Sequence, residues 1–414
     1  MAIIVKLSDI LDNSHGLYKL ANCLDWEFLI QELGPYYSEG PGRPEIPIRV
    51  VAGLHYLKYL ESVSDEEVVA KFCENPYWQY FCGFETFQHE FPCHPTTLVK
   101  WRKRVGAKGM EKLLSHTIDT AKYLGLVTDK ILKNVNVDTT VQEKFITFPT
   151  DSKLCHKARI NLVLAAKKRN LELRQSYVRV GKRALIMQAR YAHAKQMKRA
   201  KQQFKIIKSY LGRVTRDIEN QVGNKIDVEL ALLLEHANRL LKQNKDSKNK
   251  LYSLHAPEVE CIAKGKASKH YEFGCKVAIV TTSKNPWVIA IHAHHGNPYD
   301  GATLKASLYQ AEKIAATKIT QAFVDKGYRG KEYKPKAIAV YIAGKKNLPR
   351  GLKKLLQGRN GIEPIIGHLK QDHRLSKNYL LGKLGDRVNA ILSGCGFNLR
   401  KILNYLKSGY PCMA

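Results

Sequence analysis

The sequence predicts an α/β protein: a mixed sheet flanked by helices, preceded by a helical N-terminal domain and interrupted by a basic helical insertion. Three observations predict this fold. Before residue 130 apolar residues recur at helical spacing, and strand-like segments appear only from residue 131 onward. A long basic segment of helical pattern then separates the first predicted strand from the later ones.

Net charge indicates the class of partner. The 414 residues include 68 Lys and Arg against 37 Asp and Glu, which gives a formal net charge of +31. Such an excess attracts polyanions and argues against an enzyme that acts mainly on cationic or apolar metabolites. The charge is also uneven, because residues 1–130 hold 14 basic and 17 acidic residues whereas residues 151–250 hold 25 and 8. We therefore expect a polyanionic partner.

The cellular location follows from what the sequence lacks. There is no stretch of about 18–20 apolar residues that would span a membrane, and no N-terminal secretory signal. The nine cysteines are odd in number and form no CxxC motif, which is typical of reduced thiols. These features predict a cytoplasmic protein.

The N-terminal domain, residues 1–125, is predicted to be helical. Residues 46–57 have apolar side chains at helical spacing, and Ser64 with Glu67 forms a capping box that begins a second helix. A short helix over residues 95–104 carries a basic cluster, namely Lys100, Arg102, Lys103 and Arg104. The array resembles a helix-turn-helix whose last helix enters a DNA groove, and a helical bundle with one solvated basic face remains equally open.

From residue 126 to the end, strands alternate with helices. The first predicted strand covers residues 131–138 and ends at Asp138, and the basic helical insertion follows over residues 152–255. Further strands are predicted at 271–282, 287–294, 322–325 and 337–342, with a helix near 303–316 and helices in the last sixty residues. The strand at 322–325 also ends in a carboxylate, Asp325.

A third acidic residue, Glu363, lies in a segment with helical spacing. If residues 358–370 are helical, apolar side chains form one buried stripe, namely Ile362, Ile365, Ile366 and Leu369. Glu363 then shares a different face with three cations, Arg359, Lys370 and Arg374. An acid flanked by cations suits a site that holds metal beside phosphate.

The three acids together predict phosphodiester chemistry. A single Asp at a strand end is ordinarily a turn residue or a cap, so the prediction depends on the combination. Two divalent ions about 3.5–4 Å apart can activate the attacking oxygen and stabilise the leaving oxygen. Hard ions such as Mg²⁺ prefer carboxylate oxygens as ligands.

These motifs carry a family resemblance. The run Val324 to Gly330, followed by Arg359, Glu363 and Lys370, resembles the DDE transposases of the insertion-sequence-5 group of bacterial mobile elements. The group's Tyr-Arg-Glu-Lys signature matches here in its last three places, and its Tyr place is Leu356. Residues 136–140, 296–300 and 42–55 are similar to other segments of the group, so the likeness covers nearly the whole chain.

The resemblance implies an RNase H-like core over residues 126–414, with Asp138, Asp325 and Glu363 as catalytic ligands for Mg²⁺ or Mn²⁺. It further implies that Arg359 and Lys370 hold the DNA end and that Tyr328 and Arg329 lie beside the scissile phosphate. The partner would be double-stranded DNA, both element ends and target, bound by a homodimer or higher oligomer in the nucleoid. The +17 net charge of residues 151–250 makes the insertion a plausible DNA-tracking surface.

Other assignments compete with this one. His292 and His294 lie on one strand face, where a surface edge is the more ordinary interpretation than a metal site. Asp300 follows a Gly-Asn-Pro sequence and is predicted to be a turn residue. A DNA-binding regulator or decayed transposase with an inactive core is one rival function, and a nuclease that cuts without joining is another.

Overall fold

The computed structural model describes residues 5–37, 45–223, 226–263, 270–330, 332–345 and 347–408. Residues 42–44 of the family-like segment therefore lie outside the described part. The chain divides into two compact units: the first joins residues 1–143 to residues 275–414, and the second is formed by residues 144–274. The predicted N-terminal domain and most of the predicted catalytic domain fall in the first unit.

The N-terminal part of the first unit is helical, as predicted. Its helices are α1 (Leu7–Ile10), α2 (Gly16–Cys23), α3 (Trp26–Leu33), α4 (Ile48–Leu60), α5 (Asp65–Glu74), α6 (Pro76–Phe81), α7 (Thr96–Tyr123) and α8 (Asp129–Leu132), with a 3₁₀ turn at Gly34–Tyr36. The capping box is present, since the Glu67 amide donates to the Ser64 hydroxyl and the Ser64 amide donates to the Glu67 carboxylate. Helix α7 is much longer than the predicted 95–104, with a break at Gly106, whose φ is +64°.

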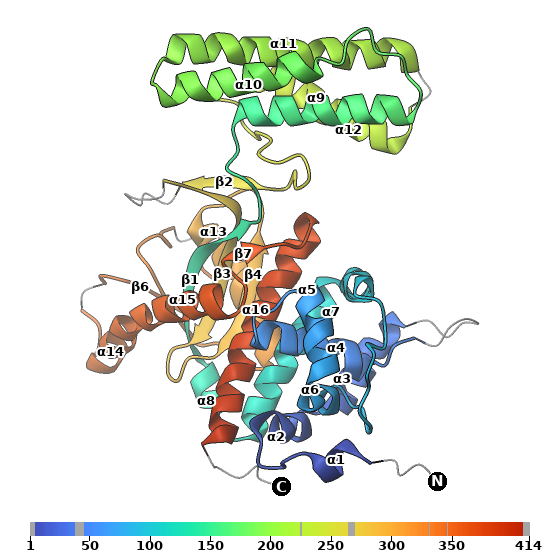
Figure 1. The fold of residues 1–414 in the computed structure, drawn as a ribbon. Helices are drawn as coiled ribbons and strands as arrows, with labels where there is room; N and C mark the ends of the chain where they lie inside the picture. The colour runs from blue at the N-terminus through green and yellow to red at the C-terminus, as the bar shows by residue number, and fades with distance from the viewer. Residues whose placement is uncertain are drawn as a thin grey trace. The chain divides into compact units, whose positions relative to one another are not determined.

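The strands form one mixed sheet, which confirms the α/β class. They are β1 (Asn134–Lys144), β2 (Glu260–Ala263), β3 (Tyr271–Thr282), β4 (Val288–His294), β5 (Gln321–Val324), β6 (Ala339–Ile342) and β7 (Lys377–Asn378). Their order is β2-β3-β1-β5-β6, with β4 also paired to β3 and β7 to β1. Strands β3 and β4, which lie side by side in Figure 1, are antiparallel, whereas β1, β5 and β6 run parallel to one another.

One predicted boundary is wrong. Strand β1 does not end at Asp138 but continues to Lys144. What ends near Asp138 is the pairing with β5, whose last paired residues are Val137 and Val324. Alternation of apolar and polar residues stops at Asp138, and that change marks the end of the ladder with β5 and not the end of the strand.

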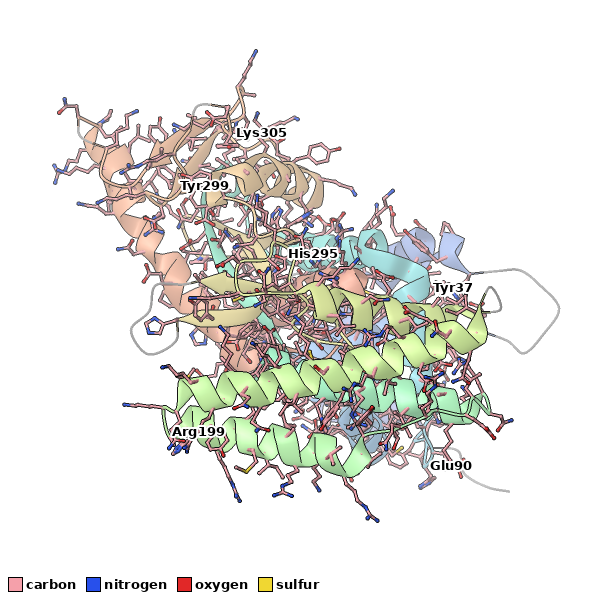
Figure 2. All side chains as sticks on the ribbon, turned by 90° about the horizontal axis from the view of Figure 1, so that it is seen from above. Tyr37, Glu90, Arg199, His295, Tyr299 and Lys305 are labelled. Carbon is pink, nitrogen blue, oxygen red and sulfur yellow. The ribbon has the colours of Figure 1, made fainter. Side chains whose placement is uncertain are left out.

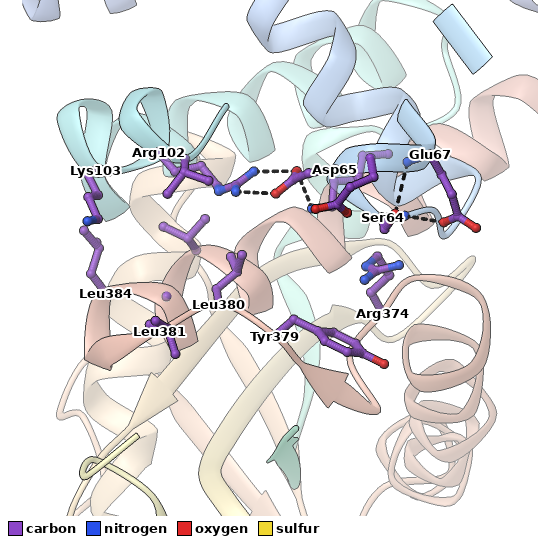
Figure 3. Close-up of a pocket in the computed structure, with 15 residues that line it drawn as sticks. Ser64, Asp65, Glu67, Arg102, Lys103, Arg374, Tyr379, Leu380, Leu381 and Leu384 are labelled. Carbon is purple, nitrogen blue, oxygen red and sulfur yellow. Dashed lines mark hydrogen bonds and ion pairs between the residues drawn. The ribbon is translucent and has the colours of Figure 1, made fainter. Parts of the chain in front are cut away.

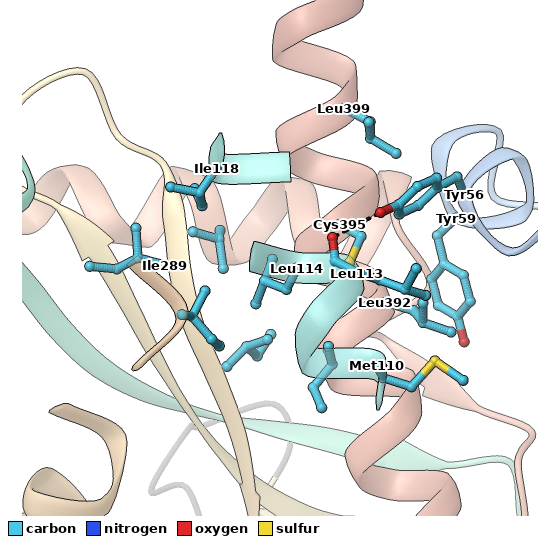
Figure 4. Close-up of a cluster of buried hydrophobic side chains, with 14 of the residues drawn as sticks. Tyr56, Tyr59, Met110, Leu113, Leu114, Ile118, Ile289, Leu392, Cys395 and Leu399 are labelled. Atoms are coloured by element: carbon cyan, nitrogen blue, oxygen red, sulfur yellow. Dashed lines mark hydrogen bonds between the residues drawn. The ribbon is translucent and has the colours of Figure 1, made fainter. Parts of the chain in front are cut away.

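Helices from both ends of the chain enclose the sheet's apolar core. The later helices are α13 (Asp300–Ala315), α14 (Arg350–Gly358), α15 (Ile362–Asp372) and α16 (Gly382–Lys407), with a 3₁₀ turn at Arg359–Gly361. Helix α16 packs against α4, α7 and β4, and α13 packs against β4 and α7. Figure 4 shows this cluster, in which Leu113 and Leu114 of α7 lie between Ile289 of β4 and Tyr56 of α4. The Tyr56 hydroxyl donates to the Leu113 carbonyl at 2.9 Å.

The second unit contains the predicted helical insertion. Its helices are α9 (Asp151–Lys168), α10 (Val178–His193), α11 (Met197–Val222) and α12 (Val228–Lys242). They share an apolar core of their own, which includes Cys155, Leu162, Leu211 and Leu234. The proposed functional division at residues 125, 152 and 255 stays a prediction.

Among the described residues, no helix has both the length and the apolar character needed to cross a membrane. Cys23 is disulfide-bonded, which departs from the expectation that every thiol is reduced, whereas Cys73, Cys82 and Cys261 are free.

Candidate active site

The sheet register brings two of the predicted acids together. In the parallel pair β1–β5, Val137 lies opposite Val324. Asp138 and Asp325 are the next residues along the two strand segments, so they follow the last paired residues side by side. Two acids 187 positions apart in the sequence are thereby neighbours in space.

Helix α15 supplies the third acid. Of the predicted stripe, Ile362, Ile365 and Leu369 are buried and Ile366 is half-buried against the same core, while Glu363 lies on the exposed side. Pro364 is the third residue of the helix, where its missing amide hydrogen breaks no intrahelical bond.

One guanidinium connects all three acids. Nη1 of Arg359 lies 3.4 Å from Oδ2 of Asp138, and Nη2 lies 3.9 Å from an oxygen of both Asp325 and Glu363. The Arg359 side chain is only 8% exposed, whereas those of Asp138, Asp325 and Glu363 are 20%, 51% and 66% exposed. The structure thus gathers the three predicted carboxylates round a buried cation, with Asp325 and Glu363 largely exposed and Asp138 less so.

The donor set fits a hard divalent ion by its chemistry, since all three groups offer carboxylate oxygens, the ligands that Mg²⁺ prefers. Within the described ranges, however, no group of three or more His, Cys, Asp or Glu side chains is arranged to hold a metal ion. The positive charge that contacts the three acids in this structure is the Arg359 guanidinium. Metal binding at this edge therefore requires the carboxylates to turn from the guanidinium toward the ion.

Asp300, which the sequence assigned to a turn, belongs to this site instead. It is the first residue of α13, and its Oδ1 accepts hydrogen bonds from the Thr139 hydroxyl at 3.0 Å and from Lys276 Nζ at 2.9 Å. The Thr139 amide in turn donates to Oδ1 of Asp138 at 2.7 Å. Lys276 thus fixes Asp300, and Asp300 accepts the hydrogen bond of Thr139, the residue next to Asp138. The turn residues before Asp300 hid its place at a helix start, where an acidic side chain is favoured.

Tyr328 and Arg329 occupy different environments. Tyr328 is 1% exposed, and burial, followed by the negative charges of Asp138 and Asp300, raises its pKa well above the usual value. This burial argues against direct contact between Tyr328 and DNA. Arg329 has an exposed side chain on the loop after β5, and its amide donates to the Tyr299 hydroxyl at 3.0 Å.

Lys370 and Arg374, predicted to share a helical face with Glu363, lie in different surroundings. Lys370 lies in the last turn of α15. Arg374 follows the end of the helix with φ of +64°, and its guanidinium donates to the Ser62 carbonyl at 3.1 Å. Arg374 therefore does not share a helical face with Glu363, contrary to the prediction.

The basic cluster of α7 is also divided. Lys100, Lys103 and Arg104 are exposed. Arg102 is buried and donates to both carboxylate oxygens of Asp65, at 2.9 and 2.6 Å, while Lys58 donates to Oδ1 at 2.6 Å (Figure 3). Arg102 thus joins α7 to α5 beside a pocket of about 830 Å³ and is not placed to contact DNA.

Electrostatics explain why this buried ion pair persists. Burial by itself raises the pKa of Asp65, but hydrogen bonds and charges from Arg102 and Lys58 outweigh that effect and hold the pKa far below its usual range. Burial lowers the pKa of Lys58 to about 8. The carboxylate therefore stays ionised and stabilises the contact between the two helices.

The two histidines of β4 lie close together in the sheet. The rings of His292 and His294 lie 4.5 Å apart, and burial lowers the pKa of His294 to about 3. They belong to no metal-binding group found in the described part of the chain.

Comparisons with known proteins agree with part of these expectations. Residues 5–104 match a family model described as "Transposase domain (DUF772)". The chain is 48% identical over 191 residues to "Uncharacterized protein ORF8 in nfe locus" from Rhizobium meliloti. The aligned region covers 46% of this chain and 92% of that protein. No solved structure matches the chain.

Proposed function

This chain belongs to the transposase family, and from that premise we propose that it is the DNA transposase of a bacterial insertion sequence. It cuts DNA at the terminal inverted repeats of its element and joins the resulting 3′-hydroxyl ends to target DNA. The gathering of Asp138, Asp325 and Glu363 round Arg359 is the observation that carries the proposal.

The core is proposed to be RNase H-like. Its support is a mixed sheet flanked by helices, in which the first strand and a later parallel strand each carry an acid at the same edge. The long insertion after β1 also lies where the family resemblance requires it.

We assign the chemistry to residues as follows. Asp138, Asp325 and Glu363 would hold Mg²⁺ or Mn²⁺, which when bound activates the attacking oxygen and stabilises the leaving oxygen. Arg359, released from the acids, donates to the phosphate, because a planar guanidinium matches phosphate geometry. Asp300 orients Thr139, and through it Asp138.

The DNA itself is proposed to contact the half-buried Lys370 and the exposed cations around this edge and on α7. Arg329 and Lys370 lie on the elements that carry Asp325 and Glu363, and Lys100, Lys103 and Arg104 extend the contact to the N-terminal helices. Joining two element ends to one target calls for at least a homodimer. The proposed setting is the cytoplasm, at the nucleoid.

The test is a cleavage-and-joining assay on DNA that carries the element's own ends, with Mg²⁺, comparing the wild-type protein with Glu363→Gln. The proposal expects metal-dependent nicking at the ends and joined product, both lost in the variant. Glu332→Gln, which changes an exposed acid after β5, is the matched control and should cleave normally. Tight DNA binding by the wild type without cleavage under any divalent metal would favour the regulator or decayed-copy alternative, and nicking without joining would favour a nuclease.

A further inference from the structure

The second unit contains a long segment without acidic residues. From Leu173 to Arg216 the sequence has thirteen Lys and Arg and no Asp or Glu. This segment includes α10 and most of α11, two helices that pack against each other as a hairpin, and Asp217 and Glu219 follow it in the last turns of α11. Positive charge at this density, with no acid between, costs self-repulsion in the folded state.

The protein does not neutralise these cations internally. Among the residues that the structure describes, no ion pair involves any of the thirteen. Arg169, just before the segment, shows the contrasting arrangement, since it pairs with Asp227 at 2.6 Å and with Glu229 at 2.9 Å. The cations of the hairpin are therefore available to an external polyanion.

On α10 the cations form a single stripe. Exposed residues follow one another at helical spacing on one side, namely Arg179, Lys182, Arg183, Ile186, Arg190 and His193. At 100° per residue they lie within about 100° of one another, and at 1.5 Å per residue the stripe is about 21 Å long. The opposite side holds the buried Gly181 and Ala184.

Helix α11 repeats the pattern over a greater length. Its exposed side carries Lys198, Lys201, Lys205, Arg213 and Arg216, over about 27 Å of helix. Its other side packs into the unit's apolar core through residues such as Ile207 and Leu211. Figure 2 shows the hairpin with Arg199 at the end where the two helices meet, and the Arg199 guanidinium lies 5.8 Å above the Tyr191 ring of the partner helix.

We propose that the α10–α11 hairpin is a contact surface for the phosphate backbone of duplex DNA outside the element's recognised ends. The chemistry of the stripes favours backbone contact, because Lys and Arg neutralise phosphates without reading sequence. Stripes of 21 to 27 Å match roughly six to eight base pairs at 3.4 Å each. An anionic membrane is the weaker fit, since the apolar faces of both helices are already buried in the unit.

This inference deepens the proposed function and rests on it only for the identity of the polyanion. The probe is a short duplex without the element's ends, bound by the full-length chain at a series of salt concentrations. The test variant changes four stripe cations to Gln: Lys182, Arg183, Lys201 and Lys205. The matched control changes four exposed lysines of the same unit outside the stripes: Lys153, Lys167, Lys245 and Lys248.

The expected result is a difference in salt dependence. Each phosphate contact contributes about 0.9 to the slope of log affinity against log salt, so the hairpin variant should lose up to about 3.6 of that slope. The control should change the slope by less than about 1. Equal losses in both variants would overturn the proposal, because they would reflect net charge alone, and so would weakened binding to anionic vesicles with unchanged binding to DNA.

Cleavage at the element's ends, measured on the same proteins at low salt, separates the two claims. If the wild type does not cleave but the slopes differ, the hairpin surface stands and the transposase mechanism fails. If the wild type cleaves and the slopes agree, the hairpin proposal fails alone. Melting curves of both variants check that the substitutions leave the fold intact.

Discussion

Replacing Asp300 tests whether the network beside Asp138 is real. The Lys276 side chain is 11% exposed and donates to Asp300 Oδ1 at 2.9 Å and to the Pro298 carbonyl at 2.6 Å. Removing one partner of a fully buried ion pair costs about 3–5 kcal/mol. Because Asp300 is 33% exposed and Lys276 keeps one acceptor, we expect Asp300→Ala to lower the free energy of unfolding by about 2 kcal/mol. Asp300→Asn keeps an acceptor oxygen and should cost about 1 kcal/mol.

A double-mutant cycle isolates the contact. Lys276→Met removes the same ion pair from the other side, so the combined variant should be less destabilised than the two single effects added. We expect a coupling of about 1–2 kcal/mol, from urea unfolding midpoints of the four proteins. Single-turnover cleavage should also slow in Asp300→Ala while DNA binding is unchanged, because Thr139 loses its orientation beside Asp138. Additivity within about 0.3 kcal/mol, or cleavage at the wild-type rate, would refute the network.

Three further outcomes follow from the structure. Arg102→Ala should lower the free energy of unfolding in urea by about 2–3 kcal/mol, since the Asp65 side chain, 16% exposed, loses one of its two cations and keeps Lys58. The exposed Lys103→Ala should change stability by less than about 0.5 kcal/mol and weaken DNA binding, and the reverse ranking would place Arg102 at the DNA surface. Burial lowers the pKa of His116 from 6.5 to about 4, so on acidification the unfolded chain binds a proton at this residue at a higher pH than the folded chain does. The free energy of unfolding should therefore fall by about 2 kcal/mol between pH 8 and pH 5. His116→Asn should remove that share of the pH dependence, and an unchanged dependence of stability on pH would contradict it. Arg359→Met should tighten Mn²⁺ binding in a titration, because no cation then competes for the acids, while cleavage is lost; weaker metal binding would mean that Arg359 supports the site instead.

Local sequence patterns anticipated much of this fold because each depends on near neighbours. The Ser64–Glu67 capping box and the buried stripe of α15 are set by spacings of three and four residues, and both are present. The acids were found in the same way, from an apolar run followed by Asp138 or Asp325. Their proximity was suggested by the family resemblance, and only the register of β1 and β5 supplies it physically.

Contacts between distant segments account for what the sequence analysis missed. Nothing near Arg102 shows that it meets Asp65 across two helices, so it looked like one member of an exposed cluster. Asp300 was hidden in the same way, since its partners Thr139 and Lys276 come from β1 and β3. The end of β1 was misplaced because a change of alternation marks the loss of one neighbouring strand as readily as the end of a strand.

The most direct test of the central claim is metal binding at the three acids, measured by electron paramagnetic resonance of Mn²⁺ with the full-length protein and no DNA. We predict that the wild type binds Mn²⁺, that Mg²⁺ displaces it, and that Asp138→Asn and Asp325→Asn each abolish this binding. Glu219→Gln, at an exposed acid of the second unit, should bind as the wild type does. Undiminished Mn²⁺ binding in both Asp variants would contradict the assignment of these carboxylates to a catalytic metal site.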